Sequence, residues 1–357
     1  MANDTSASLT AGIDVGDKYC AICVLDEDGE IVERTRVPTS KTALKRAFGK
    51  RDRMRVALEV GTHSAWMSDL LEVSGHEVIV ANARELERLT KSDRKNDDND
   101  AELLARLARV DPRLLAPIKH RAKALRQDLA IVRTREALVE ARTKLINCVR
   151  GQVKTTGGKL PKCSSEAFHR RASEHIPIEL APAIEPLLAT IAELTEKIRS
   201  FDKKIEELAS NKYPESALLQ QVAGVGALTS LAFMLTLGDR TRFKKSRDVG
   251  PYFGLVPRQQ RSCTIDPQLK ITKAGNKLVR RLLVGSAHCI LRRRASDSDL
   301  RRWGLSLAAR GGKNAKKRAV VGLARKLAVL LHRLWTTGEA YEPLRLAKKN
   351  GVVQENE

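Results

Sequence analysis

The order of strand-like and helical patterns near the start of the chain is the feature that most restricts how it can fold. Three strand-like runs come first: LTAGIDV at 9–15, YCAICVL at 19–25 and EIVERTRV at 30–37. The breaks between them, GDK and DEDG, contain the Gly and Asp residues that tight turns use. We therefore expect the chain to begin with a meander of hairpins.

Helical and strand-like patterns alternate after the meander. Helical patterns cover 41–48, 64–73 and 99–108, and the strand-like runs MRVALEV and EVIVA lie at 54–60 and 77–81. Three strands followed by alternating helix and strand is the element order of the ribonuclease-H-like fold. We predict an α/β domain of this type over residues 1–118.

Long helical patterns replace the strand signal from about residue 119. A weak apolar stripe at 125–153 precedes a strict one with steps of four and three, a spacing that keeps one face of a helix against a partner. The strict stripe consists of Leu187, Ile191, Leu194, Ile198, Phe201, Ile205 and Leu208. We predict an antiparallel coiled arm over 119–210, bent within 155–186. The periodicity fits a core inside one subunit and an arm that pairs with a second subunit equally well.

The remaining residues predict a helical C-terminal domain over 211–345, followed by a polar tail at 346–357. Gly224 and Gly226 in VAGVGALTS resemble a helix-hairpin-helix turn, whose backbone amides can hold a phosphate. They fit glycines that end a helix equally well. The predicted fold class is thus α/β plus all-α.

The formal charge of +22 favours a polyanion as partner, with nucleic acid the leading candidate. An anionic membrane is the weaker alternative, because no apolar run approaches the roughly 18 residues of a spanning helix. Scattered cysteines and the lack of a signal peptide indicate a reduced, cytoplasmic protein, associated with the nucleoid. Cys20 and Cys23 lie in a strand-like run without a second pair, which favours strand residues over a zinc site.

Four acidic residues lie where a ribonuclease-H-like fold would bring them together: Asp14, Glu59, Asp97 and Asp100. The first two end strands, and the last two are three apart at a helix start, so that they can face the same side. Carboxylates from several elements suit a pair of magnesium ions, which would activate an attacking oxygen and stabilise a leaving one. Asp17, Asp93 and Asp98 are competitors, and an Asp at a helix start can simply be a cap. His63, close to Glu59, is weak support for acid-base catalysis.

Ser262 suggests a second chemistry. A serine hydroxyl is a poor nucleophile at neutral pH, but cationic groups that hold a phosphate can make it attack phosphorus. The neighbouring cations that we predict to bind nucleic acid are Arg258, Arg261, Lys270, Lys273, Arg280 and Arg281. The alternative is a surface hydroxyl that touches a backbone phosphate.

Seven motifs, in order over nearly the whole chain, resemble the IS110-type DEDD transposases, which are bridge-RNA-guided recombinases of insertion sequences. The motifs are GIDVGDKY, LEVGTHS, KNDDNDAELLA, VAGVGALTS, GPYFGLVPRQQRS, KITKAGNKLVRRLL and KKRAVVGLARKLA. The resemblance implies a RuvC-like catalytic domain whose acidic residues match Asp14, Glu59, Asp97 and Asp100. It thus favours Asp97 and Asp100 over the competing residues Asp93 and Asp98. The family serine matches Ser262, and Cys263 stands where relatives usually have glycine.

The resemblance also implies a mechanism and partners. Mg²⁺, or Mn²⁺ in its place, would bind the acidic cluster, and the serine would form a covalent phosphoserine with DNA. The implied partners are double-stranded donor and target DNA and a structured non-coding guide RNA. A homodimer or homotetramer would combine the acidic cluster of one protomer with the serine of another. Two other hypotheses stay open: a RuvC-like metal-dependent endonuclease acting on branched DNA, and a non-catalytic basic scaffold that binds nucleic acid.

Overall fold

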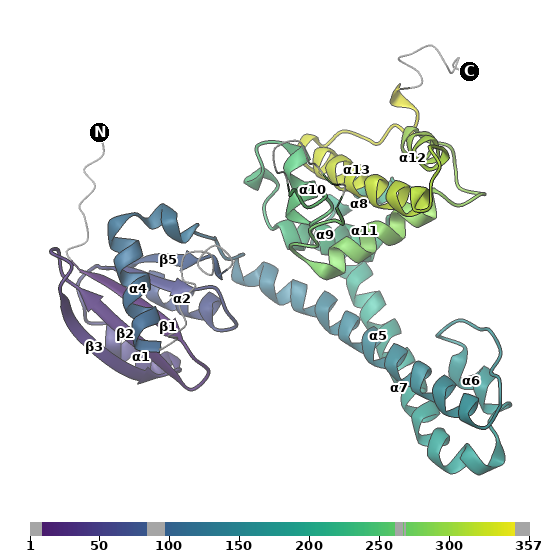
Figure 1. The fold of residues 1–357 in the computed structure, drawn as a ribbon, viewed down its shortest axis with the longest axis horizontal. Coiled ribbons are helices and arrows are strands. Elements are labelled where there is room, and N and C mark those ends of the chain that lie inside the picture. The colour runs from purple at the N-terminus through teal and green to yellow at the C-terminus, as the bar shows by residue number, and fades with distance from the viewer. Residues whose placement is uncertain (1–8, 84–96, 261–266, 268, 347–357) are drawn as a thin grey trace. The chain divides into compact units, whose positions relative to one another are not determined.

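The computed structural model of the chain describes residues 9–83, 97–260, 267 and 269–346. The chain divides into two compact units, residues 1–120 and 121–357 (Figure 1). The second unit contains both the predicted arm and the predicted C-terminal helices. Their division at about residue 210 stays a prediction.

The first unit is built on a five-stranded mixed sheet with the order β3-β2-β1-β4-β5. Strands β1 (Thr10–Val15), β2 (Tyr19–Leu25) and β3 (Ile31–Pro38) pair antiparallel, which confirms the predicted meander. Strands β4 (Arg55–Glu59) and β5 (Glu77–Ala81) follow, with β4 parallel to both β1 and β5. The two strands predicted to carry acidic residues, β1 and β4, are therefore direct neighbours.

Helices cover both faces of this sheet (Figure 1). Helices α1 (Lys41–Phe48) and α2 (Ser64–Val73) pack on one face through apolar side chains such as Phe48 and Met67. Helix α4 (Asp97–Val110) packs on the opposite face. The bounds predicted for α1 and α2 are confirmed, whereas α4 extends two residues beyond each end of the predicted 99–108. The short helix η1 (Pro112–Leu115) follows α4.

The second unit consists of helices and connecting segments in the residues that the structure describes. Its α-helices are α5 (Lys123–Thr155), α6 (Phe168–Ser173), α7 (Ala181–Asn211), α8 (Ser216–Gln220), α9 (Ala227–Leu237), α10 (Val249–Tyr252), α11 (Lys277–Ile290), α12 (Asp299–Ala309) and α13 (Ala315–Thr337). Three short 3₁₀ helices accompany them: η2 (Ile178–Leu180), η3 (Arg240–Arg242) and η4 (Ser246–Asp248). Residues of α9, α11 and α13 form the centre of the largest apolar core.

The long helices α5 and α7 lie side by side within one chain (Figure 1). Arg135 Nε of α5 donates to Asp202 Oδ1 of α7 at 2.8 Å, and buried Arg142 donates to Thr195 Oγ1 at 3.2 Å. In the predicted stripe, alternate members are fully buried, namely Ile191, Ile198 and Ile205. The intervening members, Leu187, Leu194, Phe201 and Leu208, are half-buried. Part of the stripe thus packs inside one chain, and pairing with a second subunit stays a prediction.

Candidate functional site

Asp14 and Glu59 lie on the same face of the sheet. In the parallel register of β1 and β4, Ile13 pairs with Leu58, and each acidic residue is the next one along its strand. Ala57, which lies two residues before Glu59 in β4, packs against apolar residues of α4. Because side chains of a strand alternate between faces, Asp14 and Glu59 point to the face that α4 covers.

A glycine in β1 lets α4 approach that face closely. A Cβ on Gly12 would overlap the carbonyl oxygen of Ala101 and come within 2.6 Å of the amide nitrogen of Ala105. Only a residue without a side chain therefore fits there. Asp14, two residues further along the strand, consequently lies toward the N-terminal end of the same helix.

The first turn of α4 supplies the other two acidic residues. The buried stripe of this helix consists of Ala101, Leu104, Ala105 and Ala108. Asp97 and Asp100 precede Ala101 and Leu104 by one helical turn each, so they extend this stripe toward the strand ends. Asp98, three residues before Ala101, also lies near this stripe, and Arg36 Nε of β3 is 3.3 Å from its Oδ1. Arg36 Nη2 also lies 3.5 Å from Asp97 Oδ2 and partly neutralises this end of the cluster.

The electrostatics of Asp14 indicate that the four carboxylates lie near one another. Burial, and then the negative charges of Asp97, Asp100 and Glu59, raise the pKa of Asp14 from its ordinary 3.8 to about 6. A hydrogen bond from the backbone N–H of Val15 opposes this shift. The pKa of an acid rises in this way when its neighbours repel the ionised form.

A divalent cation would relieve that repulsion, and carboxylate oxygens are the ligands that Mg²⁺ prefers. Among the described residues, no three His, Cys, Asp or Glu side chains are already arranged to hold one metal ion. The four carboxylates therefore fit a hard cation through their charge and donor atoms. They would have to draw closer together to bind it.

His63 is held beside this site, just before α2. The Trp66 indole N–H donates to His63 Nδ1 at 3.1 Å, and His63 Nε2 lies 3.5 Å from Asp17 Oδ1. Because Nδ1 accepts a hydrogen bond, the neutral ring carries its proton on Nε2. Asp17 thus interacts with His63, and the described contacts place neither of them in the carboxylate cluster.

The segment around Ser262 is flanked by an isolated β-bridge, called the ladder below. Ser262, Arg261 and Cys263 lie outside the described residues. On either side of them, Pro257 and Ile271 form an antiparallel bridge, and Arg258 N donates to Lys270 O at 3.0 Å. The side chains of Arg258, Lys270 and Lys273 are exposed beside this ladder. The chain on both sides of the serine segment is therefore anchored.

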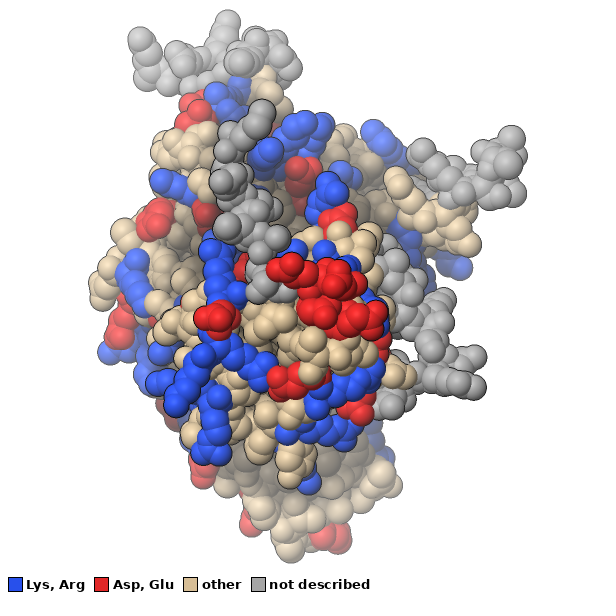
Figure 2. All heavy atoms as spheres, turned by 90° about the vertical axis from the view of Figure 1, so that its left-hand side faces the viewer, with Lys and Arg blue, Asp and Glu red and all other residues tan. Residues whose placement is uncertain are grey.

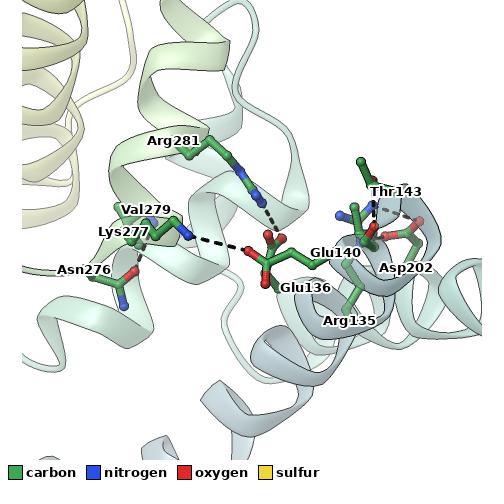
Figure 3. Close-up of polar contacts among 10 residues, drawn as sticks. Arg135, Glu136, Glu140, Thr143, Asp202, Asn276, Lys277, Val279 and Arg281 are labelled. Atoms are coloured by element: carbon green, nitrogen blue, oxygen red, sulfur yellow. Dashed lines mark hydrogen bonds and ion pairs between the residues drawn. The ribbon is translucent and has the colours of Figure 1, made fainter. Parts of the chain in front are cut away.

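Arg280 and Arg281, predicted to bind nucleic acid, both have protein partners. Arg280 Nη1 donates to Phe253 O at 3.0 Å and to Ala274 O at 2.6 Å, and burial lowers the pKa of this guanidinium. Arg281 of α11 forms an ion pair with Glu136 of α5 (Figure 3). Arg280 thus ties α11 to the ladder, and Arg281 ties α11 to α5. Their binding of nucleic acid stays a prediction.

The glycines of the predicted hairpin turn differ from each other. Gly224 has a φ of +81°, and a Cβ there would come within 2.9 Å of Cys289 Cβ on α11. Gly226 is the N-cap residue of α9 and has open space around its Cα. Close packing therefore accounts for Gly224, and phosphate binding by either glycine stays a prediction.

The positive charge belongs almost entirely to the second unit. Residues 1–120 contain 19 Lys and Arg against 21 Asp and Glu, whereas residues 121–357 contain 46 against 22. Figure 2 shows acidic side chains gathered in one patch of the viewed face, with Lys and Arg spread around it. The carboxylate cluster thus belongs to a nearly neutral unit. No helix in the described part of the chain is long and apolar enough to cross a membrane.

Sequence reasoning missed two residues that shape the site, Gly12 and Arg36. A glycine inside an apolar strand indicates a close backbone approach, so the signal for Gly12 was present. Arg36 offered no signal, because its contact with α4 depends on the fold. Cys20 and Cys23 are free and buried in β2, as expected of strand residues.

Comparisons with known proteins cover most of the chain. A family model described as "Transposase", for the IS110 DEDD type, matches residues 11–157, and one described as "Transposase IS116/IS110/IS902 family" matches residues 216–301. Among curated proteins, the transposase for insertion sequence element IS1111A of Coxiella burnetii is 28% identical, with 92% of this chain and 90% of that protein covered. A probable family 20 transposase of Pseudomonas aeruginosa is 27% identical, with coverages of 93% and 98%. A putative transposase of Sinorhizobium fredii is 30% identical, with coverages of 86% and 79%.

Proposed function

Because this chain belongs to the IS110 family of insertion-sequence transposases, we propose that it cuts and rejoins donor and target DNA through a covalent phosphoserine at Ser262. The observation that carries the proposal is that Asp14 and Glu59 lie on neighbouring strands and on the face covered by α4, the helix whose first turn contains Asp97 and Asp100. The order of the strands around β1 supports a RuvC-like assignment for this unit.

The serine step conserves the energy of the DNA backbone. The Ser262 oxygen forms a bond to phosphorus while one phosphorus–oxygen bond of the DNA backbone breaks. The leaving DNA oxygen takes up a proton and the serine hydroxyl gives one up, so the protons balance. The reverse step, with a hydroxyl of another strand as the attacking group, releases the serine and joins the strands without ATP.

The carboxylates are proposed to hold divalent metal, Mg²⁺ or Mn²⁺. When bound there, the metal would stabilise the negative charge that develops on the phosphoryl and leaving oxygens. The protein's own contribution is the geometry: Gly12 allows α4 to bring Asp97 and Asp100 toward Asp14 and Glu59. Arg36 would have to release or share Asp97 when the metal binds.

Guidance by a structured bridge RNA is carried over from the family. The high positive charge of residues 121–357 supports it, because a polyanion can be held there by its phosphates while base pairing supplies the sequence. The same resemblance supports a homodimer or homotetramer in which the acidic cluster of one protomer acts with Ser262 of another.

Denaturing gels of the protein with its cognate element-end DNA test the serine step. The wild-type protein should give a protein–DNA adduct that resists denaturation, and Ser262→Ala should give none. Cys263→Ala is the matched control, since it removes the neighbouring nucleophile and should keep the adduct. Free cleaved ends from Ser262→Ala would favour the endonuclease hypothesis instead.

A second variant separates catalysis from binding. Asp14→Asn keeps the shape of the side chain and removes its charge, so we expect DNA binding to persist while the adduct disappears. Unchanged adduct formation by Asp14→Asn would refute metal catalysis at this cluster. If the wild-type protein binds DNA but yields neither adduct nor cleavage with any divalent metal, the basic-scaffold hypothesis is favoured.

A further inference from the structure

Tyr252 of α10 contacts two arginines that are far apart in the sequence. Arg121 Nη2 donates to the Tyr252 hydroxyl at 3.2 Å. The guanidinium carbon of Arg242 lies 5.1 Å from the centroid of the Tyr252 ring and 5.7 Å from that of Phe243. The two rings pack edge to face, with their centroids 5.2 Å apart. The Tyr252–Phe243 pair thus contacts the Arg242 guanidinium through its rings and the Arg121 guanidinium through the Tyr252 hydroxyl.

Arg121 is held firmly at this position. Its Nε donates to the carbonyl oxygen of Thr236 at 2.8 Å, near the C-terminal end of α9, where the helix dipole favours a cation. Gly238, the C-cap of α9, has a φ of +82°, and a Cβ there would lie 3.4 Å from Arg121 Cγ. Among the described residues, Arg121 Nη1 donates to no protein atom.

The neighbourhood of Arg121 is positively charged. Burial lowers the pKa of Arg121, and the positive charges of Arg242 and Arg133 lower it further, against an opposing effect of Tyr252. Within the described ranges, Arg121 and Arg242 contact backbone carbonyl oxygens and aromatic side chains, and neither forms an ion pair with a carboxylate. Asp239, beside Arg242 in the chain, accepts hydrogen bonds from the backbone N–H and hydroxyl of Thr241.

Other arginines of the second unit have carboxylate partners. Arg135 pairs with Asp202, Arg281 with Glu136, and Arg302 with Asp297. Residues 240–333 as a whole contain 25 Lys and Arg against 4 Asp and Glu, so this stretch is strongly basic. Two guanidiniums on one aromatic support, neither of them in an ion pair with a carboxylate, suit an anion from outside the chain.

We propose that Arg121 and Arg242 form a phosphate-binding site that holds the backbone of nucleic acid on the second unit. The site rests on the proposed function in needing nucleic acid as a partner. It differs from the cations near Ser262, because its members come from the start of the second unit and from η3. Planar guanidiniums suit a phosphodiester, whose two free oxygens can accept paired hydrogen bonds.

The test measures how the affinity of the full-length protein for a random-sequence DNA duplex depends on salt, using fluorescence anisotropy. Arg242→Gln should weaken binding several-fold on all sequences and reduce the slope of log K against log salt by about 0.9, the value for one lost phosphate contact. Arg199→Gln, which removes an equal charge paired with Glu196 on the arm, is the matched control and should leave the slope unchanged. Tyr252→Phe keeps the ring under Arg242 but removes the hydroxyl that holds Arg121, and should weaken binding less.

A second arm distinguishes a nucleic-acid phosphate from a free anion. Inorganic phosphate, added at constant ionic strength, should compete with DNA for the wild-type protein and raise its melting temperature less than duplex DNA does. If Arg242→Gln has the same slope as Arg199→Gln, the inference is overturned, even if phosphate alone stabilises the protein.

Ser262→Ala should bind DNA with the wild-type slope, and Arg242→Gln should still form the covalent adduct at saturating DNA. The two results can therefore be told apart. An unchanged salt slope for Arg242→Gln would refute the phosphate site alone, whereas a wild-type protein that binds no DNA or forms no adduct would refute the proposed function.

Discussion

Gly12 of β1 faces Ala101 of α4 so closely that even a methyl group at Gly12 would overlap the Ala101 carbonyl oxygen. The obstacle is backbone, which cannot rotate away as a side chain can. The contact sets the distance between β1, which contains Asp14, and α4, which begins with Asp97. The acidic cluster therefore depends on a residue that has no chemistry of its own.

Gly12→Ala should lower the free energy of unfolding of the first unit by about 1–3 kcal/mol, the usual cost of inserting a methyl group into a packed interface. The same change should reduce adduct formation, because α4 must move away from β1. Chemical denaturation followed by circular dichroism measures the first effect. Gly61→Ala is the control, since nothing lies within 4 Å of a Cβ at that position. Equal stability of the two variants would show that α4 does not need this close approach.

Asp14→Asn should stabilise the protein in the absence of divalent metal, because it removes the charge that Asp97, Asp100 and Glu59 repel. Half-burial of the group and screening by solvent limit the gain to on the order of 1 kcal/mol. Mg²⁺ should then raise the melting temperature of the wild-type protein more than that of the variant. A variant that is less stable than wild type without metal would contradict mutual repulsion within the cluster.

Glu136→Ala should destabilise the second unit by about 1–3 kcal/mol. The Glu136 side chain is only 12% exposed, and its loss leaves Arg281 without its carboxylate partner. Glu140→Ala offers a matched control on the same helix: its ion pair with Lys277 spans 3.9 Å between exposed side chains (Figure 3) and should contribute at most about 1 kcal/mol. Urea denaturation of both variants tests the difference, and equal losses would argue against a specific role for Glu136.

The stability of the second unit should fall in mild acid because of His332. This buried ring contacts Arg240 O through Nε2 at 3.1 Å and Ser246 Oγ through Nδ1 at 2.9 Å. Burial lowers the pKa of His332 below its ordinary 6.5, against the opposing hydrogen bond to Arg240. The unfolded chain therefore takes up the proton first, so the contribution of His332 is present above about pH 6.5 and is lost as the pH falls toward the lowered pKa.

The measurement for His332 is the difference in unfolding free energy between pH 7.5 and pH 5.5, for the wild type and for His332→Gln. The variant should be less stable at pH 7.5 and should lose less stability on acidification. An identical pH dependence of the two proteins would assign the acid sensitivity to other groups.

The sequence alone predicted the elements whose side chains alternate or recur regularly. The bounds of α1, α2 and β5 follow from apolar periodicity and turn residues, because these short elements pack in the way their patterns require. Asp97 and Asp100 were separated from Asp93 and Asp98 only through the family resemblance, since several aspartates in one segment fit the same spacing. Both Asp97 and Asp98 precede the buried stripe of α4 in the structure, so the choice of Asp97 stays a prediction.

Contacts between distant segments were beyond sequence reasoning. Arg36 and Asp97, or Arg281 and Glu136, come together only when helices dock, and a long basic side chain can reach many partners. Arg280 illustrates the difficulty: within a run of cations it reads as a contact for phosphate, yet its guanidinium donates to two backbone carbonyl oxygens. The sequence shows that such residues are basic, but only the tertiary packing shows which group each basic side chain contacts.

The uneven distribution of charge means that mutation can act on two properties of this protein independently. If the second unit holds nucleic acid as proposed, substitutions in residues 121–357 that add or remove a cation would change how long nucleic acid remains bound and so how many encounters are productive. Substitutions around β1 and α4 change what happens during one encounter. An insertion sequence could therefore become less active in its host through gradual loss of residence time, with the carboxylate cluster left intact and able to recover.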